Sequence, residues 1–118
     1  MAVEKSILKT IRKGVGLPVT GYDVFDDEII MDINSVFSIL FQLGVGDEPF
    51  HITGEDEKWD DFLTDEDANL EMTKTYIRNK VKLMFDPPTS SFLVELLERQ
   101  CSEFESRVNY EVDPRGAE

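Results

Sequence analysis

The clearest candidate for metal chemistry is the run Asp65-Glu66-Asp67-Ala68-Asn69, which puts oxygen-bearing side chains at the first, third and fifth positions of a calcium-binding loop. Such a loop requires glycine at its sixth position and a bidentate glutamate at its twelfth. This chain has Leu70 and Tyr76 there. Because acidic residues before a helix are explained more simply by helix capping, we predict no calcium site.

His51 is the one histidine and Cys101 the one cysteine, so the sequence excludes a two-histidine zinc site and an internal disulfide. Cys101 lies at the margin of an amphipathic stripe, where a small buried apolar residue is the usual role. The acidic pairs Asp26-Asp27 and Asp60-Asp61 sit on segments expected to be exposed, without the burial that acid–base catalysis requires. No phosphate loop, dinucleotide fingerprint or nucleophile elbow is present, so we predict no enzyme, cofactor or metal site.

The elements that would position these residues are helices. Apolar periodicity predicts an all-α fold, a small helical bundle with a short N-terminal helix. We expect that helix over 3–13 and three main helices over about 26–43, 67–85 and 88–109. An irregular loop is expected over 45–66, with Phe50 to Thr53 as a short extended segment and Trp59 to Leu63 as a loop or single helical turn held on the core.

The helix over 26–43 reads as a core helix. Its apolar stripe comprises Ile29, Ile30, Ile33, Val36, Phe37, Leu40 and Phe41. Asp26 or Asp27 is placed to cap its start, and Gly44 is placed to end it.

The helix over 67–85 has two apolar faces and a basic row. One face carries Leu70, Ile77, Val81 and Met84, and the opposite face carries Met72, Tyr76 and Leu83. The basic row, with members four residues apart, consists of Lys74, Arg78 and Lys82. A helix with two apolar faces must be covered on both, so we expect another subunit to cover the second face.

The last helix is expected to start after Asp86-Pro87-Pro88, because proline ends the preceding helix and suits a first helical turn. Its predicted core stripe is Leu93, Leu96, Leu97, Phe104 and Val108. Gln100 falls within that stripe and therefore needs a polar partner or an interface. The helix completes a single domain over 1–109, followed by a flexible tail over 110–118.

The chain has 118 residues and a net charge of −13, distributed in blocks. Acidic residues dominate 47–71, whereas 74–82 contains only basic charges, so a continuous nucleic-acid-binding surface is not expected. No segment reaches the roughly 18–20 apolar residues of a membrane helix, and the first residues do not read as a secretion signal. A lone cysteine favours a reducing, cytoplasmic site of synthesis.

One continuous block carries a family resemblance. The stretch from Glu71 to Ser91, EMTKTYIRNKVKLMFDPPTSS, resembles the central signature of head–tail connector (adaptor) proteins from tailed phages of Gram-positive bacteria. The blocks at 4–8, 27–37, 42–46 and 59–62 also resemble that family in order and spacing. The resemblance covers about residues 3–109.

This resemblance implies a non-enzymatic subunit of the virion neck, assembled in the bacterial cytoplasm. Family members form a ring, usually a dodecamer, below the portal protein. The ring extends the DNA channel, binds no specific DNA sequence, and provides a platform for a stopper or tail-completion protein. We take as interface candidates the basic row with its acidic counterparts and the second apolar face, namely Asp60, Asp61, Met72, Lys74, Tyr76, Arg78, Lys82 and Leu83.

Pairing of the basic row with the acidic 55–67 segment of an adjacent copy would be salt-sensitive and would set register more than affinity. Ordinary pairing within the chain is the alternative. Two other functions also remain open, an acidic inhibitor that mimics DNA and a helical adaptor unrelated to phages.

Overall fold

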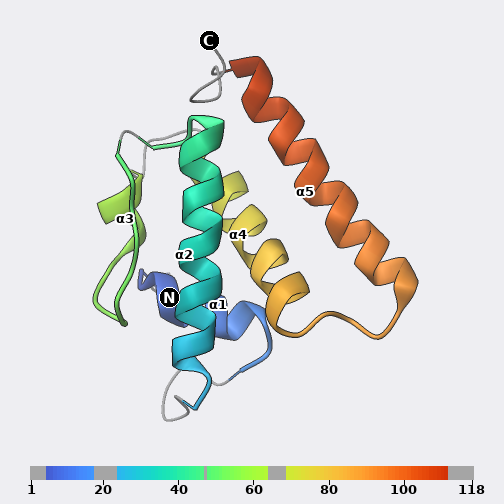
Figure 1. Cartoon of the computed structure of the whole chain (residues 1–118), viewed down its shortest axis with the longest axis horizontal. Coiled ribbons are helices and arrows are strands. Elements are labelled where there is room, and N and C mark those ends of the chain that lie inside the picture. The colour runs from blue at the N-terminus through green and yellow to red at the C-terminus, as the bar shows by residue number, and fades with distance from the viewer. Residues whose placement is uncertain (1–4, 18–23, 47, 64–68, 112–118) are drawn as a thin grey trace.

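The computed structural model describes residues 5–17, 24–46, 48–63 and 69–111, the last three of them without their side chains. The described part contains five helices, α1 (Ile7–Gly14), α2 (Asp26–Leu43), α3 (Trp59–Phe62), α4 (Leu70–Phe85) and α5 (Ser91–Glu111), arranged as in Figure 1. This arrangement confirms the predicted all-α bundle. Most of the calcium-loop run, 65–68, and the tail beyond Glu111 lie outside the described residues.

Helix α2 supplies much of the core. Its buried residues, each at most 1% exposed, are Ile29, Ile33, Val36, Phe37 and Leu40. Burial of each such side chain stabilises the fold by about 1.5–3 kcal/mol before conformational entropy is counted. The predicted bounds of this helix are confirmed, and Gly44 ends it in the left-handed region at φ 96°, where its N–H bonds back to the last turn.

The start of α2 differs from the prediction. Neither aspartate caps the helix, because Phe25 occupies the N-cap position and Asp26 is instead bound by Arg12 of α1. The Arg12 side chain is 2% exposed; its Nε donates to Asp26 Oδ1 at 2.9 Å, and its Nη1 lies 2.6 Å from Glu55 Oε2. The hydrogen bond to Asp26 is the main cause of the raised pKa of Arg12, and burial opposes it. One buried cation thus joins α1, α2 and the loop before α3.

The segment before α3 is tied to α1 by backbone hydrogen bonds. The Ile7 N–H donates to the Glu57 carbonyl at 3.1 Å, and the Trp59 N–H donates to the Lys5 carbonyl at 3.0 Å. The Trp59 indole, 3% exposed, also donates to Thr10 Oγ1 at 3.1 Å. The expectation that Trp59 starts a single helical turn held on the core is confirmed.

The segment from Phe50 to Thr53 forms no ladder with another strand among the described residues, so a paired strand is not present there. A side chain replaces the ladder: Asn34 of α2 accepts from the Ile52 N–H at 2.7 Å and donates to the Ile52 carbonyl at 3.0 Å. Phe50 and Phe62 pack edge-on against Phe37, with ring centroids 5.0 and 4.7 Å away. These contacts fix the loop on one side of α2.

Helix α5 begins at Ser91 and not at Pro88, and it continues past the predicted boundary at 109 as far as Glu111. Its buried residues, Cys101, Phe104 and Val108, all lie in its second half. In Figure 1 the start of α5 lies away from the other helices, and its later turns approach them. The first half of α5 is therefore kept in position mainly because it is continuous with the buried second half.

Candidate interaction surfaces

The second apolar face of α4 is covered at its centre by α5 of the same chain. Tyr76 is 2% exposed, and its ring stacks on Phe104 with centroids 4.6 Å apart. Met72 and Leu83 are partly buried against the core. The expectation that this face waits uncovered for a neighbour is therefore wrong at Tyr76, because α5 reaches it first.

Charged and polar groups strengthen the contact between α4 and α5. The Tyr76 hydroxyl donates to Glu105 Oε2 at 2.6 Å, and Lys80 Nζ lies 3.6 Å from the same oxygen. Burial, followed by the Glu105 carboxylate, raises the pKa of Tyr76, so the hydroxyl remains a donor. Asn79, 2% exposed, donates to Gln100 Oε1 at 2.9 Å, which confirms that Gln100 needs a polar partner.

An open cleft of about 310 Å³ lies between α4 and α5 beside this contact. Its apolar lining comes from Met72, Tyr76 and Phe104, of which Met72 is the least buried. Exposed charged residues at its edge are Glu71, Glu103 and Arg107. Thr75, Asn79 and Gln100 complete the lining. A small apolar cleft with a charged edge suits the side chain of a protein partner.

Exposed apolar side chains gather where α4 ends and α5 begins. Met84 is 47% exposed, Phe92 68% and Leu93 45%. Met84 and Leu93 were expected in core stripes, and both expectations are wrong. Leu93 is uncovered because the start of α5 lies away from the other helices (Figure 1). Phe92 belonged to no predicted stripe. Its position off the apolar face of α5 was the one sequence signal that it would be exposed.

Two of the three residues in the basic row already form ion pairs within the chain. Lys74 Nζ lies 3.2 Å from Glu71 Oε2, and Lys82 Nζ lies 3.0 Å from Asp86 Oδ2. Pairing within the chain is therefore observed for these two lysines. Arg78 is exposed and has no ion pair with any residue that the structure describes.

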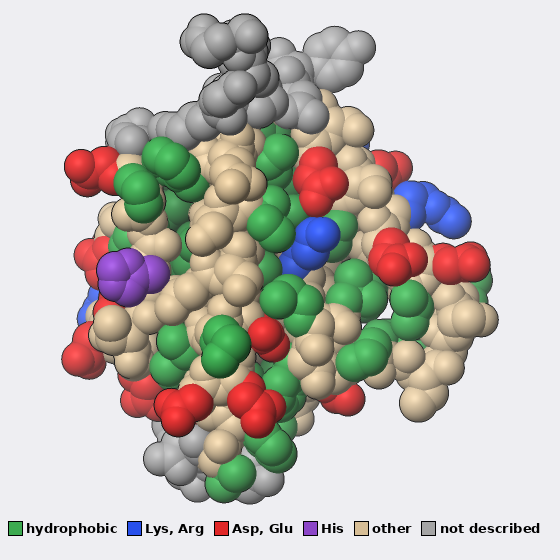
Figure 2. All heavy atoms as spheres, viewed as in Figure 1, with side chains coloured by type: hydrophobic (Ala, Val, Ile, Leu, Met, Phe, Trp, Pro, Cys, Tyr) green, Lys and Arg blue, Asp and Glu red, His purple; other side chains and the backbone are tan. Residues whose placement is uncertain are grey.

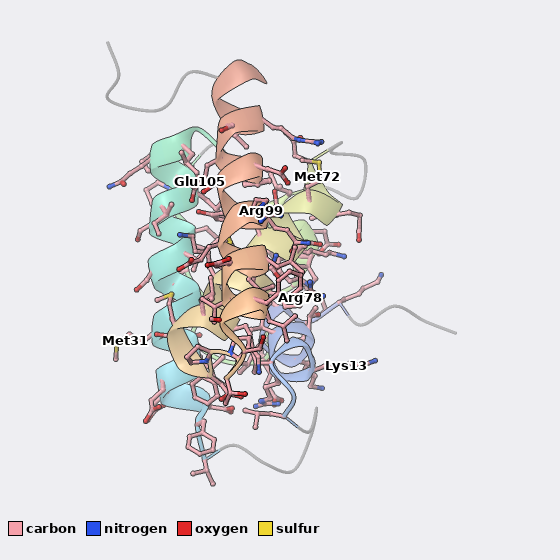
Figure 3. All side chains as sticks on the ribbon, turned by 90° about the vertical axis from the view of Figure 1, so that its right-hand side faces the viewer. Lys13, Met31, Met72, Arg78, Arg99 and Glu105 are labelled. Carbon is pink, nitrogen blue, oxygen red and sulfur yellow. The ribbon has the colours of Figure 1, made fainter. Side chains whose placement is uncertain are left out.

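The aliphatic part of the Arg78 side chain lies against Gly14, where α1 meets α4. A Cβ atom placed on Gly14 would lie 2.6 Å from the Arg78 Cγ, so only glycine permits this approach. The guanidinium extends beyond the crossing and donates to Asn79 Oδ1 at 3.1 Å. In Figure 3, α5 with Arg99 faces the reader, and Lys13 projects from α1 towards the right of the view.

Asp60 and Asp61 are exposed on α3, as expected. Asp61 Oδ2 accepts from the Lys58 N–H at 2.8 Å and so stabilises the start of that helical turn. Neither aspartate forms an ion pair with a described residue, and the structure does not bring them against Arg78 or Lys82.

The residues considered for catalysis are not assembled into a site. Cys101 is 3% exposed, and burial raises the pKa of its thiol, whereas a reactive cysteine needs a lowered pKa. His51 is exposed. Within the described ranges, no group of three or more histidine, cysteine or acidic residues is placed to hold a metal ion.

No helix in the part of the chain that the structure describes has the length and apolar content needed to cross a membrane. Neither the curated proteins nor the solved structures include a match to the chain. A family model, phage connector protein, matches residues 7–115, from the first residue of α1 to beyond the last of α5. That family is structural and not enzymatic, and it implies a place in the virion neck with portal and tail proteins as partners. Since the match covers nearly the whole sequence and the described helices form the expected bundle, the chain belongs to the phage connector protein family.

Proposed function

We propose that copies of this chain form a ring, a dodecamer by the family resemblance, below the portal of a filled capsid. The ring extends the DNA channel and provides the docking platform for the next neck or tail protein. Its subunits are made and assembled in the host cytoplasm. The observation that carries this proposal is the match of the connector family model to residues 7–115.

The channel role is supported by charge. At a net charge of −13, the subunit repels phosphate groups more than it attracts them, so DNA can pass without being held. We infer no catalytic step, because the role needs only shape and repulsion.

The exposed charges Arg78, Asp60 and Asp61 fit the outer positions of a subunit contact, where they would favour the correct register. Such positions are hydrated and screened by salt, so their contribution to affinity is small. Lys74 and Lys82 already have partners within the chain and are weaker candidates.

A DNA-mimic inhibitor is the second function considered. It requires carboxylates spaced like phosphates along one face. In Figure 2 the acidic side chains are scattered over the visible face and do not form such a row. The family match also disfavours an adaptor unrelated to phages.

Electron microscopy of the purified chain mixed with portal-bearing heads from the same phage tests the proposal. We expect added ring-shaped density at the portal end only. Heads that gain no density there would contradict the connector ring. A chain that instead displaces DNA from a nuclease or a repressor would support the DNA-mimic alternative.

A further inference from the structure

We propose that Phe92 of one copy inserts into the α4–α5 cleft of the next copy, as a repeated head-to-tail contact. This inference rests on the proposed ring and names the surfaces that would join its subunits. It needs two complementary features on one chain, a protruding apolar side chain and a cleft able to receive it.

Phe92 provides the protruding side chain. It is 68% exposed in the first turn of α5, next to Leu93, which is 45% exposed. The start of α5 lies at the edge of the molecule, after the connection from α4 (Figure 1). Exposed aromatic side chains are costly in water and are enriched at the centres of protein interfaces.

The cleft provides the receiving surface. Its volume of about 310 Å³ is near the lower end of the range for small-molecule sites, roughly 300–1,000 Å³, and so suits one or two side chains. Met72, Tyr76 and Phe104 offer it a thioether and two aromatic rings. Phe92 would there meet the sulfur and ring contacts that aromatic side chains favour.

The two features cannot meet within one chain. Phe92 and Phe104 are twelve residues apart on the same helix, which places them about 18 Å apart along its axis at 1.5 Å per residue. Because α5 is continuous between them, its own Phe92 cannot fold back into the cleft. A surface that meets a different surface on the next copy gives a heterologous contact, the kind that closes rings.

The charged residues also favour a second copy of this chain as the partner that enters the cleft. Arg99 follows Phe92 by seven residues, about two turns, and so lies on the same side of α5. It is exposed and has no ion pair among the described residues. Glu71, Glu103 and Arg107 are exposed at the edge of the cleft; Glu71 is already paired with Lys74, whereas Glu103 has no ion pair among the described residues. An incoming α5 would thus bring the Arg99 cation towards Glu103, and a second copy of this chain carries that cation on the same side of α5 as its protruding aromatic residue.

Two single variants separate the two surfaces. Phe92→Ser removes the inserted side chain. Met31→Ser is its control, because Met31 is 66% exposed and projects from α2 at the left of Figure 3, away from α5. Thr75→Trp fills the cleft from an exposed lining position, and Ser106→Trp adds the same bulk on α5 outside the lining. All four positions are exposed, and circular dichroism checks that each variant is folded.

Sedimentation velocity over a concentration series measures the association. Wild type and both controls should self-associate, while Phe92→Ser and Thr75→Trp should each associate at least about tenfold more weakly, as expected for a central anchor. An equimolar mixture of these two variants should form dimers but nothing larger, because one intact cleft and one intact Phe92 remain.

Self-association of either variant at the wild-type level would overturn the contact, as would a wild type that stays monomeric at every concentration. The same variants on portal-bearing heads separate the two proposals. Rings formed by Phe92→Ser refute this contact and leave the connector ring standing, whereas absence of a ring with wild type refutes the connector ring itself.

Discussion

Replacement of Asp26 by asparagine tests whether the buried Arg12 holds α1, α2 and the loop before α3 together. The guanidinium is 2% exposed, so it depends on its partners for solvation. The Asp26 side chain is 20% exposed, and that of Glu55 is 43% exposed. The two carboxylates should therefore contribute unequally.

The expected magnitudes follow from this burial. Removing one partner of a fully buried ion pair costs about 3–5 kcal/mol, and because Asp26 retains some solvent contact and Glu55 remains, we expect about 2–3 kcal/mol for Asp26→Asn. Glu55→Gln should cost about 1 kcal/mol or less, because that carboxylate is screened by water. The double variant Arg12→Met/Asp26→Asn, which leaves no buried charge, should be more stable than Asp26→Asn alone.

Urea unfolding followed by far-ultraviolet circular dichroism measures each free energy of unfolding, and Asp27→Asn is the control for charge loss at the same helix start. Asp27 is exposed. If Glu55→Gln destabilised the chain as much as Asp26→Asn, or if the double variant were less stable than Asp26→Asn, the argument from desolvation would be refuted.

Three further changes test the remaining contacts. Tyr76→Phe removes the hydrogen bond to Glu105 and should cost about 1 kcal/mol near neutral pH. Because the folded-state pKa of Tyr76 is raised, the wild type should lose this stability as the pH rises above the ordinary tyrosine value of about 10, whereas Tyr76→Phe should not. Unfolding curves measured between pH 8 and 11 test this difference. Gly44→Ala should cost about 1 kcal/mol in urea unfolding, because alanine is strained at φ 96°; an unchanged midpoint would contradict this. Burial opposes the lowered pKa of Glu57, but hydrogen bonds led by the Thr53 side chain outweigh it, so stability should fall as pH drops below about 4.5. Glu57→Gln should flatten this loss, and an equally steep acid limb would show that other groups cause it.

Local pattern was sufficient for the position and ends of α2. Its apolar stripe repeats at the helical period over five turns, and Gly44 ends it with a backbone conformation that favours glycine. Asp26 and Asp27 are equally plausible caps in the sequence. The role of Asp26 was missed because it is decided by Arg12, a residue 14 positions away on another helix.

The two apolar faces of α4 illustrate a different limit. Periodicity correctly indicates that both Ile77 and Tyr76 need cover, since both are at most 2% exposed. It does not identify the element that covers each face. Likewise the end of α4 at Phe85 was predicted, but the stripe of α5 includes Leu93 and does not show that this position lies beyond the cover of the other helices.

The division of α5 into an anchored half and a protruding half bears on how such a subunit can join others. Tyr76, Asn79 and Lys80 hold the middle and the second half of α5 through one ring stack, two hydrogen bonds and an ion pair. The first half buries none of its residues, yet it continues the same helix and is therefore held in a fixed direction. A contact residue fixed in advance loses little freedom on binding, so Phe92 can contribute most of its burial to association. The polar bonds at Tyr76 and Asn79 thus support the proposed contact without touching the neighbour, which explains why a sequence pattern for the interface alone would not include them.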